Sequence, residues 1–398
     1  MASLYSMPGS RKCALLVLML LFGSAIAGAQ PYQNGHITAT FIDSARSNRA
    51  VEVEIYYPAD VAGDNVGFAA ALSNAPVIAF GHGFVMTYEA YFNVRDAVVS
   101  QGYIIAFPTT EGSFSPSHEE FGKDLAFVLR QMAVLGNTTG SVLSGKVDTF
   151  NCVMGHSMGG GAAFLAAAGD NTIKSIATLA SAETTPSAIN AAGSITAPAL
   201  VFAGANDCVT LPADNQLPMY DGLASACKTY ISIIGGSHCQ MAESSFTCNF
   251  GESTCTPQPA ITRPQQHEVI DRYLIPWLDY HLRASCTQGA FFDSSVVADA
   301  AISYQNNCVL CPSLSVAETL KEDAAVVYPN ACEGYIQVRL PDNLPASVRI
   351  FSMAGSKLAE HTVTNGERLN VAGLSSGIYF YEVVGSDHSV VRGNFVKN

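Results

Sequence analysis

A serine flanked by glycines gives the clearest chemical signal in the sequence. Ser157 stands in the run GHSMGGG at 155–161, between an apolar segment typical of a strand and a run of small residues typical of a helix. Strand, G-x-S-x-G and helix in that order form a nucleophile elbow, a strained turn in which glycines two positions either side of the serine avoid clashes. The pattern predicts that Ser157 presents a nucleophilic hydroxyl at a sheet edge.

A serine hydroxyl attacks well only when a base removes its proton and a carboxylate orients that base. Around a nucleophile elbow the chain order is serine, acid, histidine, each on a loop that follows a strand. Asp207 follows the apolar run 199–203, and His238 follows the run 228–234. The sequence therefore predicts a catalytic triad of Ser157, Asp207 and His238.

Acyl transfer also needs N–H donors for the oxyanion of the tetrahedral intermediate. Met158 follows the nucleophile at a helix start, and Phe84 follows the apolar run 76–80 and a short loop. We predict an oxyanion hole made by the backbone N–H groups of Phe84 and Met158, with the Phe84 ring forming a wall of the substrate site. His156 is expected to pack at the rim of that site and to contact substrate, and His82 to make a structural hydrogen bond.

Alternating strands and helices must position these loops. Apolar runs typical of buried strands alternate with helical patterns, such as the one that a capping box at Ser117 and Glu120 begins. This alternation predicts an α/β fold, a mostly parallel sheet with helices on both faces and Trp277 in its core. From residue 326 onward, short strands and turns indicate a small all-β sandwich of immunoglobulin-like type.

The N-terminus has the pattern of an export signal. A basic pair at 11–12 precedes an apolar run too short to span a membrane, and small residues occupy 27–29. We expect an exported protein without a transmembrane segment. Its expected parts are a signal peptide at 1–29, a catalytic domain at 30–288, a cysteine-bearing linker at 289–325 and the sandwich at 326–398.

Cysteine count and charge narrow the chemistry further. Of 11 cysteines, removal of Cys13 with the signal peptide leaves ten, an even number that favours disulfides in an exported protein. Cys308 and Cys311 have no second Cys/His pair at zinc-finger spacing, so we expect structural bridges and no metal or cofactor, while Cys152 is expected to be free. A net charge of -13 without basic runs argues against nucleic acid and favours a neutral substrate.

The motifs together resemble a known family. GHSMGGG, the loop at 81–84, the Asp207 loop and GGSH at 235–238 are similar to those of secreted bacterial cutinases and polyester (PET) hydrolases, α/β-hydrolases related to dienelactone hydrolases. The likeness spans about residues 36–284 and implies the same triad and oxyanion donors. Because some polyester hydrolases join the acid and histidine loops, it also implies a disulfide between Cys208 and Cys239.

Two features depart from that family. Ala182 and Glu183 stand where family members usually carry a tryptophan that clamps aromatic rings, and the insert 239–255 is longer than usual and rich in cysteine. The last segment has its own resemblance. VRIFSMAGSKL at 348–358 and GLSSGIYFYEV at 373–383 are similar to the C-terminal sorting domain of the type IX secretion system, which implies passage across the outer membrane.

From these observations we expect a secreted, monomeric serine hydrolase that cleaves neutral esters or polyesters through an acyl-enzyme on Ser157. Two alternatives remain. The same triad would serve a lipase or a peptidase, although the loops contain no obvious apolar lid helix for a lipase. The chain could also be a surface adhesin with an inactive hydrolase core.

Overall fold

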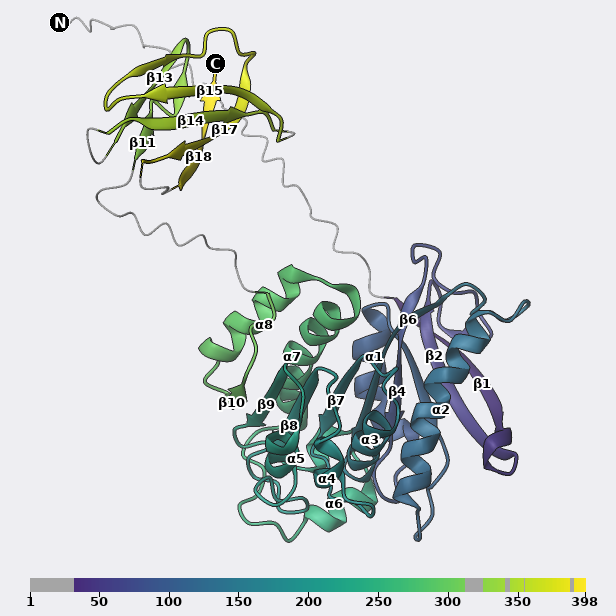
Figure 1. Ribbon diagram of the computed structural model, residues 1–398. Helices are drawn as coiled ribbons and strands as arrows, with labels where there is room; N and C mark the ends of the chain where they lie inside the picture. The colour runs from purple at the N-terminus through teal and green to yellow at the C-terminus, as the bar shows by residue number, and fades with distance from the viewer. Residues whose placement is uncertain (1–31, 312–324, 341–343, 354, 387–389) are drawn as a thin grey trace, which may run out of the picture. The chain divides into compact units, whose positions relative to one another are not determined.

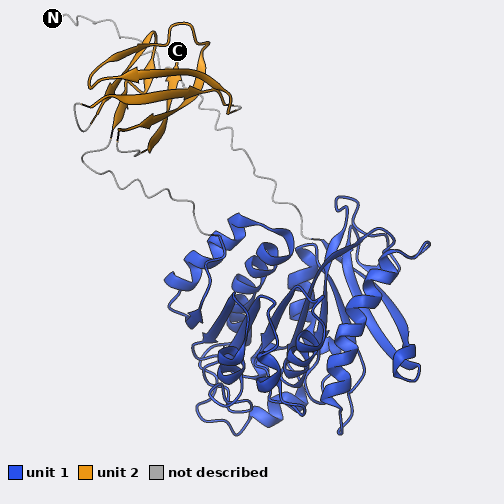
Figure 2. Cartoon of the chain, in the orientation of Figure 1, with its two compact units in different colours: residues 1–312 blue, residues 313–398 orange. Residues whose placement is uncertain are grey.

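The computed structural model describes residues 32–311, 325–340, 344–353, 355–386 and 390–398. The expected signal peptide at 1–29 lies outside these residues. The chain divides into two compact units, 1–312 and 313–398 (Figure 2).

A ten-stranded sheet forms the centre of the first unit (Figure 1). Its order is β10-β9-β8-β7-β6-β4-β5-β2-β1-β3, and the neighbours from β9 to β5 all pair in parallel. Antiparallel pairs occur only at the two ends, where β10 joins β9 and where β2 joins β5 and β1. The strands are β1 (Gln33–Asp43), β2 (Arg49–Ala59), β3 (Gly63–Asp64), β4 (Ala75–Gly81), β5 (Ile104–Pro108), β6 (Val147–His156), β7 (Ser175–Leu179), β8 (Ala199–Gly204), β9 (Lys228–Ile233) and β10 (Ile302–Asn306).

Helices cover both faces of this sheet, as the sequence predicts. Side chains along β4 alternate between two apolar clusters, with Val77 and Ala79 in one and Ile78 and Phe80 in the other, so the clusters lie on opposite faces. Helices α2 to α5 contribute to the first cluster, and α1, α7 and α8 to the second. The helices are α1 (Phe92–Ser100), α2 (His118–Gly136), α3 (Met158–Gly169), α4 (Ala188–Ala192), α5 (Gln216–Gly222), α6 (Phe246–Glu252), α7 (Arg263–Arg283) and α8 (Cys286–Ala298).

The position of Trp277 is as predicted, and the capping box at Ser117 is confirmed in part, because the N–H of Ser117 donates to Glu111 and not to Glu120. Ser117 is the N-cap of α2, and its hydroxyl accepts the N–H of Glu120 at 3.2 Å, which satisfies one of the free donors of the first turn. Trp277 is fully buried on α7, and its Nε1 donates to Ser175 Oγ at 3.1 Å. The indole thus fills the core without leaving its polar atom unpaired.

Much of the expected linker at 289–325 is part of the first unit. Helix α8 extends through its beginning, and β10 pairs along its whole length with β9. Two disulfides fasten this segment: Cys227–Cys308 joins it to the residue before β9, and Cys286–Cys311 joins it to the start of α8. The two cysteines of the C-x-x-C pair therefore form separate structural bridges. The sequence did not reveal this extension because β10 has only one buried residue and no strong strand pattern.

The second unit is all-β, as expected. Its sheets have the orders β11-β13-β16 and β12-β18-β17-β14-β15, antiparallel except for a short parallel pair of β12 with β18. Residues such as Ile336, Val348 and Phe395 form a separate core between them. The strands are β11 (Val326–Tyr328), β12 (Ala331–Cys332), β13 (Tyr335–Arg339), β14 (Ala346–Phe351), β15 (Lys357–Val363), β16 (Arg368–Asn370), β17 (Gly377–Val384) and β18 (Val390–Lys397). Within the described residues, no helix has the length and apolar character needed to cross a bilayer.

A partly buried histidine should make the first unit sensitive to mild acid. Burial against Trp277 lowers the pKa of His281 from 6.5 to about 4. Between these values the unfolded chain binds a proton that the folded chain does not, so this contribution to stability is complete above pH 6.5 and is lost as the pH falls toward 4. The loss is at most about 1.4 kcal/mol per pH unit.

We therefore expect the thermal unfolding midpoint of the wild type to fall more steeply than that of His281→Gln between pH 6.5 and 4.5. The comparison is made by scanning calorimetry of both proteins at matched ionic strength. Parallel curves for wild type and His281→Gln would contradict the assignment.

Candidate active site

The turn at Ser157 has the geometry of a nucleophile elbow. Strand β6 ends at His156, α3 begins at Met158, and Ser157 between them adopts φ 54° and ψ -120°, a conformation that costs an L-residue free energy. A Cβ at Gly155 would lie 2.3 Å from the carbonyl oxygen of Gly159, and a Cβ at Gly159 would lie 2.1 Å from that of Gly81. The glycines are therefore required because backbone occupies the space that their side chains would take.

A buried acid–base pair lies at the same edge of the sheet. Asp207 follows β8 and His238 follows β9, and both residues are only 2% exposed. His238 Nδ1 donates to Asp207 Oδ2 at 2.8 Å. A carboxylate oxygen can only accept, so Nδ1 carries the proton and Nε2 is left as the basic nitrogen.

Thr210 completes the surroundings of the Asp207 carboxylate, and sequence reasoning missed it. Its backbone N–H and that of Val209 each donate to Oδ1 at 2.8 Å, and its hydroxyl donates to Oδ2 at 2.9 Å. The same hydroxyl lies 3.0 Å from His238 Nδ1. A threonine three residues after a buried acid is a signal for such a turn, because backbone N–H groups that point inward there can bind the carboxylate.

Two side chains of α7 fix the backbone around His238. Gln266 is fully buried; its Oε1 accepts the N–H of Ser237 at 2.9 Å and its Nε2 donates to the carbonyl oxygen of Ser237 at 2.8 Å. The guanidinium of Arg263 donates to the carbonyl oxygens of Cys239 and Ala242. The backbone on both sides of the histidine is therefore held by hydrogen bonds from one helix.

Ser157, the expected nucleophile, is held through its backbone. Its N–H donates to the carbonyl oxygen of Leu179 at 3.0 Å, and its own carbonyl oxygen accepts the N–H of Ala182 at 2.9 Å. Among the described residues, no hydrogen bond joins Ser157 Oγ to His238. Catalytic hydrogen bonds commonly close only when substrate is bound, so the arrangement is compatible with a triad.

Both expected oxyanion donors are available. The N–H of Met158 is in the first turn of α3 and has no carbonyl to bind within the helix. The N–H of the neighbouring Gly83 donates to Tyr91 Oη at 2.7 Å, whereas that of Phe84 donates to no atom of the described residues. The Phe84 ring is half exposed and meets the exposed Phe114 edge to face, with 6.3 Å between the ring centroids.

The expectation that His156 contacts substrate is wrong. The residue is 0% exposed, and its ring nitrogens meet Tyr91 Oη at 3.0 Å and the carbonyl oxygen of His238 at 3.2 Å. It lies beneath the site because the strand that ends in the elbow directs alternate side chains to opposite faces. His82 has the expected structural role, since its ring lies 2.9 Å from the carbonyl oxygens of both Gly83 and Thr110.

The expected disulfide between Cys208 and Cys239 is also wrong. Cys208 pairs with Cys255, and Cys239 pairs with Cys248. Each cysteine adjacent to a proposed triad residue is thus joined to the insert that contains α6, not to the other triad loop. The unpaired cysteines of the described chain are Cys152, as expected, and Cys332.

The insert also carries exposed aromatic side chains. Phe246 and Phe250 of α6 stack with 6.3 Å between ring centroids and are 87% and 73% exposed. Phe114, on the loop after β5, is 81% exposed. These rings lie on loops that follow β5 and β9, so they flank the edge at which Ser157 lies. Exposed aromatic side chains of this kind favour apolar ligands over charged ones.

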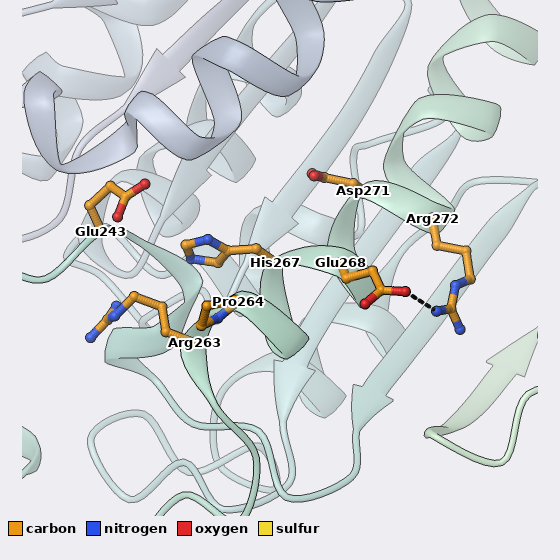
Figure 3. Close-up of a pocket in the computed structure, with 7 residues that line it drawn as sticks. All are labelled: Glu243, Arg263, Pro264, His267, Glu268, Asp271 and Arg272. Atoms are coloured by element: carbon orange, nitrogen blue, oxygen red, sulfur yellow. Dashed lines mark hydrogen bonds and ion pairs between the residues drawn. The ribbon is translucent and has the colours of Figure 1, made fainter.

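A pocket of about 630 Å³ on α7 has a different character (Figure 3). Its wall has charges of both signs, among them Glu243, Arg263 and Asp271, and burial raises the pKa of Asp271 to about 7. It is not lined by Ser157 or His238. In the described part of the chain, no three His, Cys, Asp or Glu side chains are grouped as metal ligands.

Two protein families match parts of the chain. The family described as PET hydrolase-like matches residues 27–254, which are 228 of the 398 residues. The matched part includes the elbow, both loops of the acid–base pair and most of the insert. The family described as secretion system C-terminal sorting domain matches residues 326–397, which include all of the strands from β11 to β18.

The disulfide pattern makes a direct prediction. A non-reducing peptide map of the exported protein should contain one linked pair from Cys208 and Cys255 and another from Cys239 and Cys248. Alkylation of the folded protein should leave Cys152 and Cys332 unmodified, because both are buried, and alkylation after unfolding should modify both. A peptide that links Cys208 to Cys239 would contradict the structure.

Proposed function

The chain belongs to the PET hydrolase-like family, and from this membership we propose that it is a secreted serine hydrolase that cleaves neutral carboxylic esters. One observation carries the proposal. The strained Ser157 follows β6, and the buried Asp207–His238 pair follows β8 and β9, three parallel strands of one sheet that end at the same edge. Such an edge is where α/β enzymes gather their reacting groups.

In the first half-reaction, Ser157 Oγ attacks the ester carbonyl carbon while His238 Nε2 takes the hydroxyl proton. Asp207 stabilises the imidazolium through the Nδ1–H bond. The carbonyl oxygen becomes an oxyanion and accepts hydrogen bonds from the N–H groups of Phe84 and Met158. Collapse of this intermediate breaks the bond to the alcohol, which leaves with the proton from His238, and forms the acyl-enzyme.

In the second half-reaction, water attacks the acyl carbon and gives a proton to His238. The same two N–H groups bind the oxyanion, the bond to Ser157 Oγ breaks, and the serine regains its proton from His238. The acid product leaves, and no cofactor enters the balance of atoms.

The surroundings favour a neutral, apolar ester. The exposed rings of Phe84 and Phe114 lie beside the proposed oxyanion donor, and Phe246 and Phe250 lie on the insert that follows His238. With Ala182 and Glu183 in place of the tryptophan, stacking of an aromatic acid would have to rely on phenylalanine side chains. We therefore propose aliphatic esters and polyesters as the better substrates.

The C-terminal unit bears on where the protein acts. Its match to a secretion sorting domain supports export through the type IX system, and the first unit needs oxidising conditions for its four disulfides. We propose that the enzyme works outside the cell or on its surface.

The central test is Ser157→Ala with p-nitrophenyl butyrate as substrate. We expect turnover to fall by about 10⁴-fold or more, because loss of the nucleophile removes the acyl-enzyme route. Ser144→Ala, which changes an exposed serine, should keep the wild-type rate. A fluorophosphonate should label the wild type once per chain and Ser157→Ala not at all; a wild type that neither hydrolyses the ester nor takes the label would be the inactive adhesin.

The sorting proposal has its own measurement. In the native host, deletion of 326–398 should leave the hydrolase inside the cell envelope, because the sorting domain is what the secretion system recognises. Cell fractions and medium are compared by immunoblot with those of the full chain. Equal amounts of both proteins outside the cell would contradict the proposal.

A further inference from the structure

A buried chain of hydrogen bonds connects the loop after β4 with the loop after β9. The N–H of Gly83 donates to Tyr91 Oη at 2.7 Å, Tyr91 Oη lies 3.0 Å from His156 Nδ1, and His156 Nε2 lies 3.2 Å from the carbonyl oxygen of His238. Tyr91 and His156 are both 0% exposed. One end of the chain is next to the proposed oxyanion donor Phe84, and the other end is the proposed base.

The direction of every proton in this chain follows from its ends. The carbonyl oxygen of His238 can only accept, so His156 Nε2 carries a proton. Burial lowers the pKa of His156 well below 6.5, so the ring is neutral and its Nδ1 must accept. The Tyr91 hydroxyl, whose pKa burial raises, accepts from Gly83 and has two acceptors for its single proton, His156 Nδ1 at 3.0 Å and Met86 Sδ at 3.3 Å. The nitrogen is the stronger acceptor, because a thioether sulfur accepts only weakly.

The contacts around this chain leave little room for movement. A Cβ at Gly83 would lie 3.0 Å from Tyr91 Oη and 3.2 Å from His156 Nδ1, so the backbone of the loop rests directly on the two side chains. The rings of His156 and His238 pack with 4.6 Å between centroids. The segment that carries Tyr91 also contacts the loop that follows His238, because the carbonyl oxygen of Ala90 accepts the N–H of Glu243 at 2.7 Å.

Tyr91 also determines which N–H group is free. By accepting from Gly83, it occupies that donor and orients the peptide so that the next N–H, that of Phe84, is left for another acceptor. The elbow has its own donor at Met158, on the same turn as His156. The hydroxyl of one buried tyrosine is thus two hydrogen bonds from the backbone of the base and one residue from the oxyanion donor.

We propose that Tyr91 and His156 are positioning residues that hold the Phe84 N–H and the His238 imidazole in register around Ser157. The proposal rests on the ester-hydrolase function above. Its consequence is specific to the transition state, since the oxyanion and the imidazolium exist only after attack has begun. Loss of these hydrogen bonds should lower kcat and leave KM nearly unchanged.

The first test is Tyr91→Phe, which removes one oxygen and keeps the ring. We expect kcat for p-nitrophenyl butyrate to fall by about 10- to 100-fold, the range for displaced catalytic donors, with KM within about twofold. Tyr57→Phe is the matched control, because Tyr57 is equally buried and its hydroxyl donates to the carbonyl oxygen of Val66 at 2.7 Å, outside the site. It should lose a similar amount of thermal stability and keep the wild-type kcat.

A second pair of variants tests the histidine. His156→Gln keeps a donor and an acceptor, whereas His156→Leu keeps neither, so kcat should decrease in the order wild type, Gln, Leu. Because Tyr91 and His156 act through one chain, the double variant Tyr91→Phe with His156→Leu should lose no more than His156→Leu alone.

The outcomes separate this proposal from the function on which it rests. If the wild type does not hydrolyse the ester, the proposed function fails. If the wild type is active and requires Ser157, but Tyr91→Phe has the same kcat as Tyr57→Phe, the hydrogen bonds of Tyr91 do not position the site and this proposal alone is overturned. The same holds if the Tyr91 and His156 substitutions lower kcat additively in the double variant.

Discussion

The close approach of backbone to backbone at the elbow is the constraint on which the rest of the site depends. Gly159 at the start of α3 passes so near to Gly81 at the end of β4 that a Cβ on either residue would meet the backbone of the other. Ser157, the proposed nucleophile, lies directly before this contact. Both proposed oxyanion donors have fixed positions relative to it, because one is on the helix and the other on the loop that continues from β4.

The proposed acid and base are held in a different way, by side chains that bind the backbone around His238 and by backbone N–H groups and a hydroxyl that bind the Asp207 carboxylate. Gln266 binds Ser237, Arg263 binds Cys239, and Thr210 binds Asp207. Most of the groups that make these hydrogen bonds are buried. Buried polar groups of this kind are costly unless they are paired. Their pairing fixes the loops to one arrangement, which is the preorganisation that charge stabilisation in a transition state requires.

The elbow, the order of the triad candidates and the sheet core could be predicted from the sequence because their signals are local. Ser157 has its glycines within two residues, and a buried strand is an apolar run wherever it pairs. Tyr91 and Thr210 could not be identified, since their hydroxyls acquire a role only through residues distant in the chain. The prediction that Cys208 pairs with Cys239 was wrong for the same reason. Sequence proximity to Asp207 does not determine which cysteine lies within bonding distance.

The distribution of the bridges has a consequence for the chain as a whole. All four close their loops between Cys208 and Cys311, and Cys332, within the second unit, is unpaired. No covalent crosslink of the described residues therefore spans the junction of the units. Hydrolysis of one peptide bond after Cys311 would detach the C-terminal unit without a reductant, and the disulfide Cys227–Cys308 would still hold β10 beside β9. The sorting domain could therefore be removed with all four disulfides of the first unit intact.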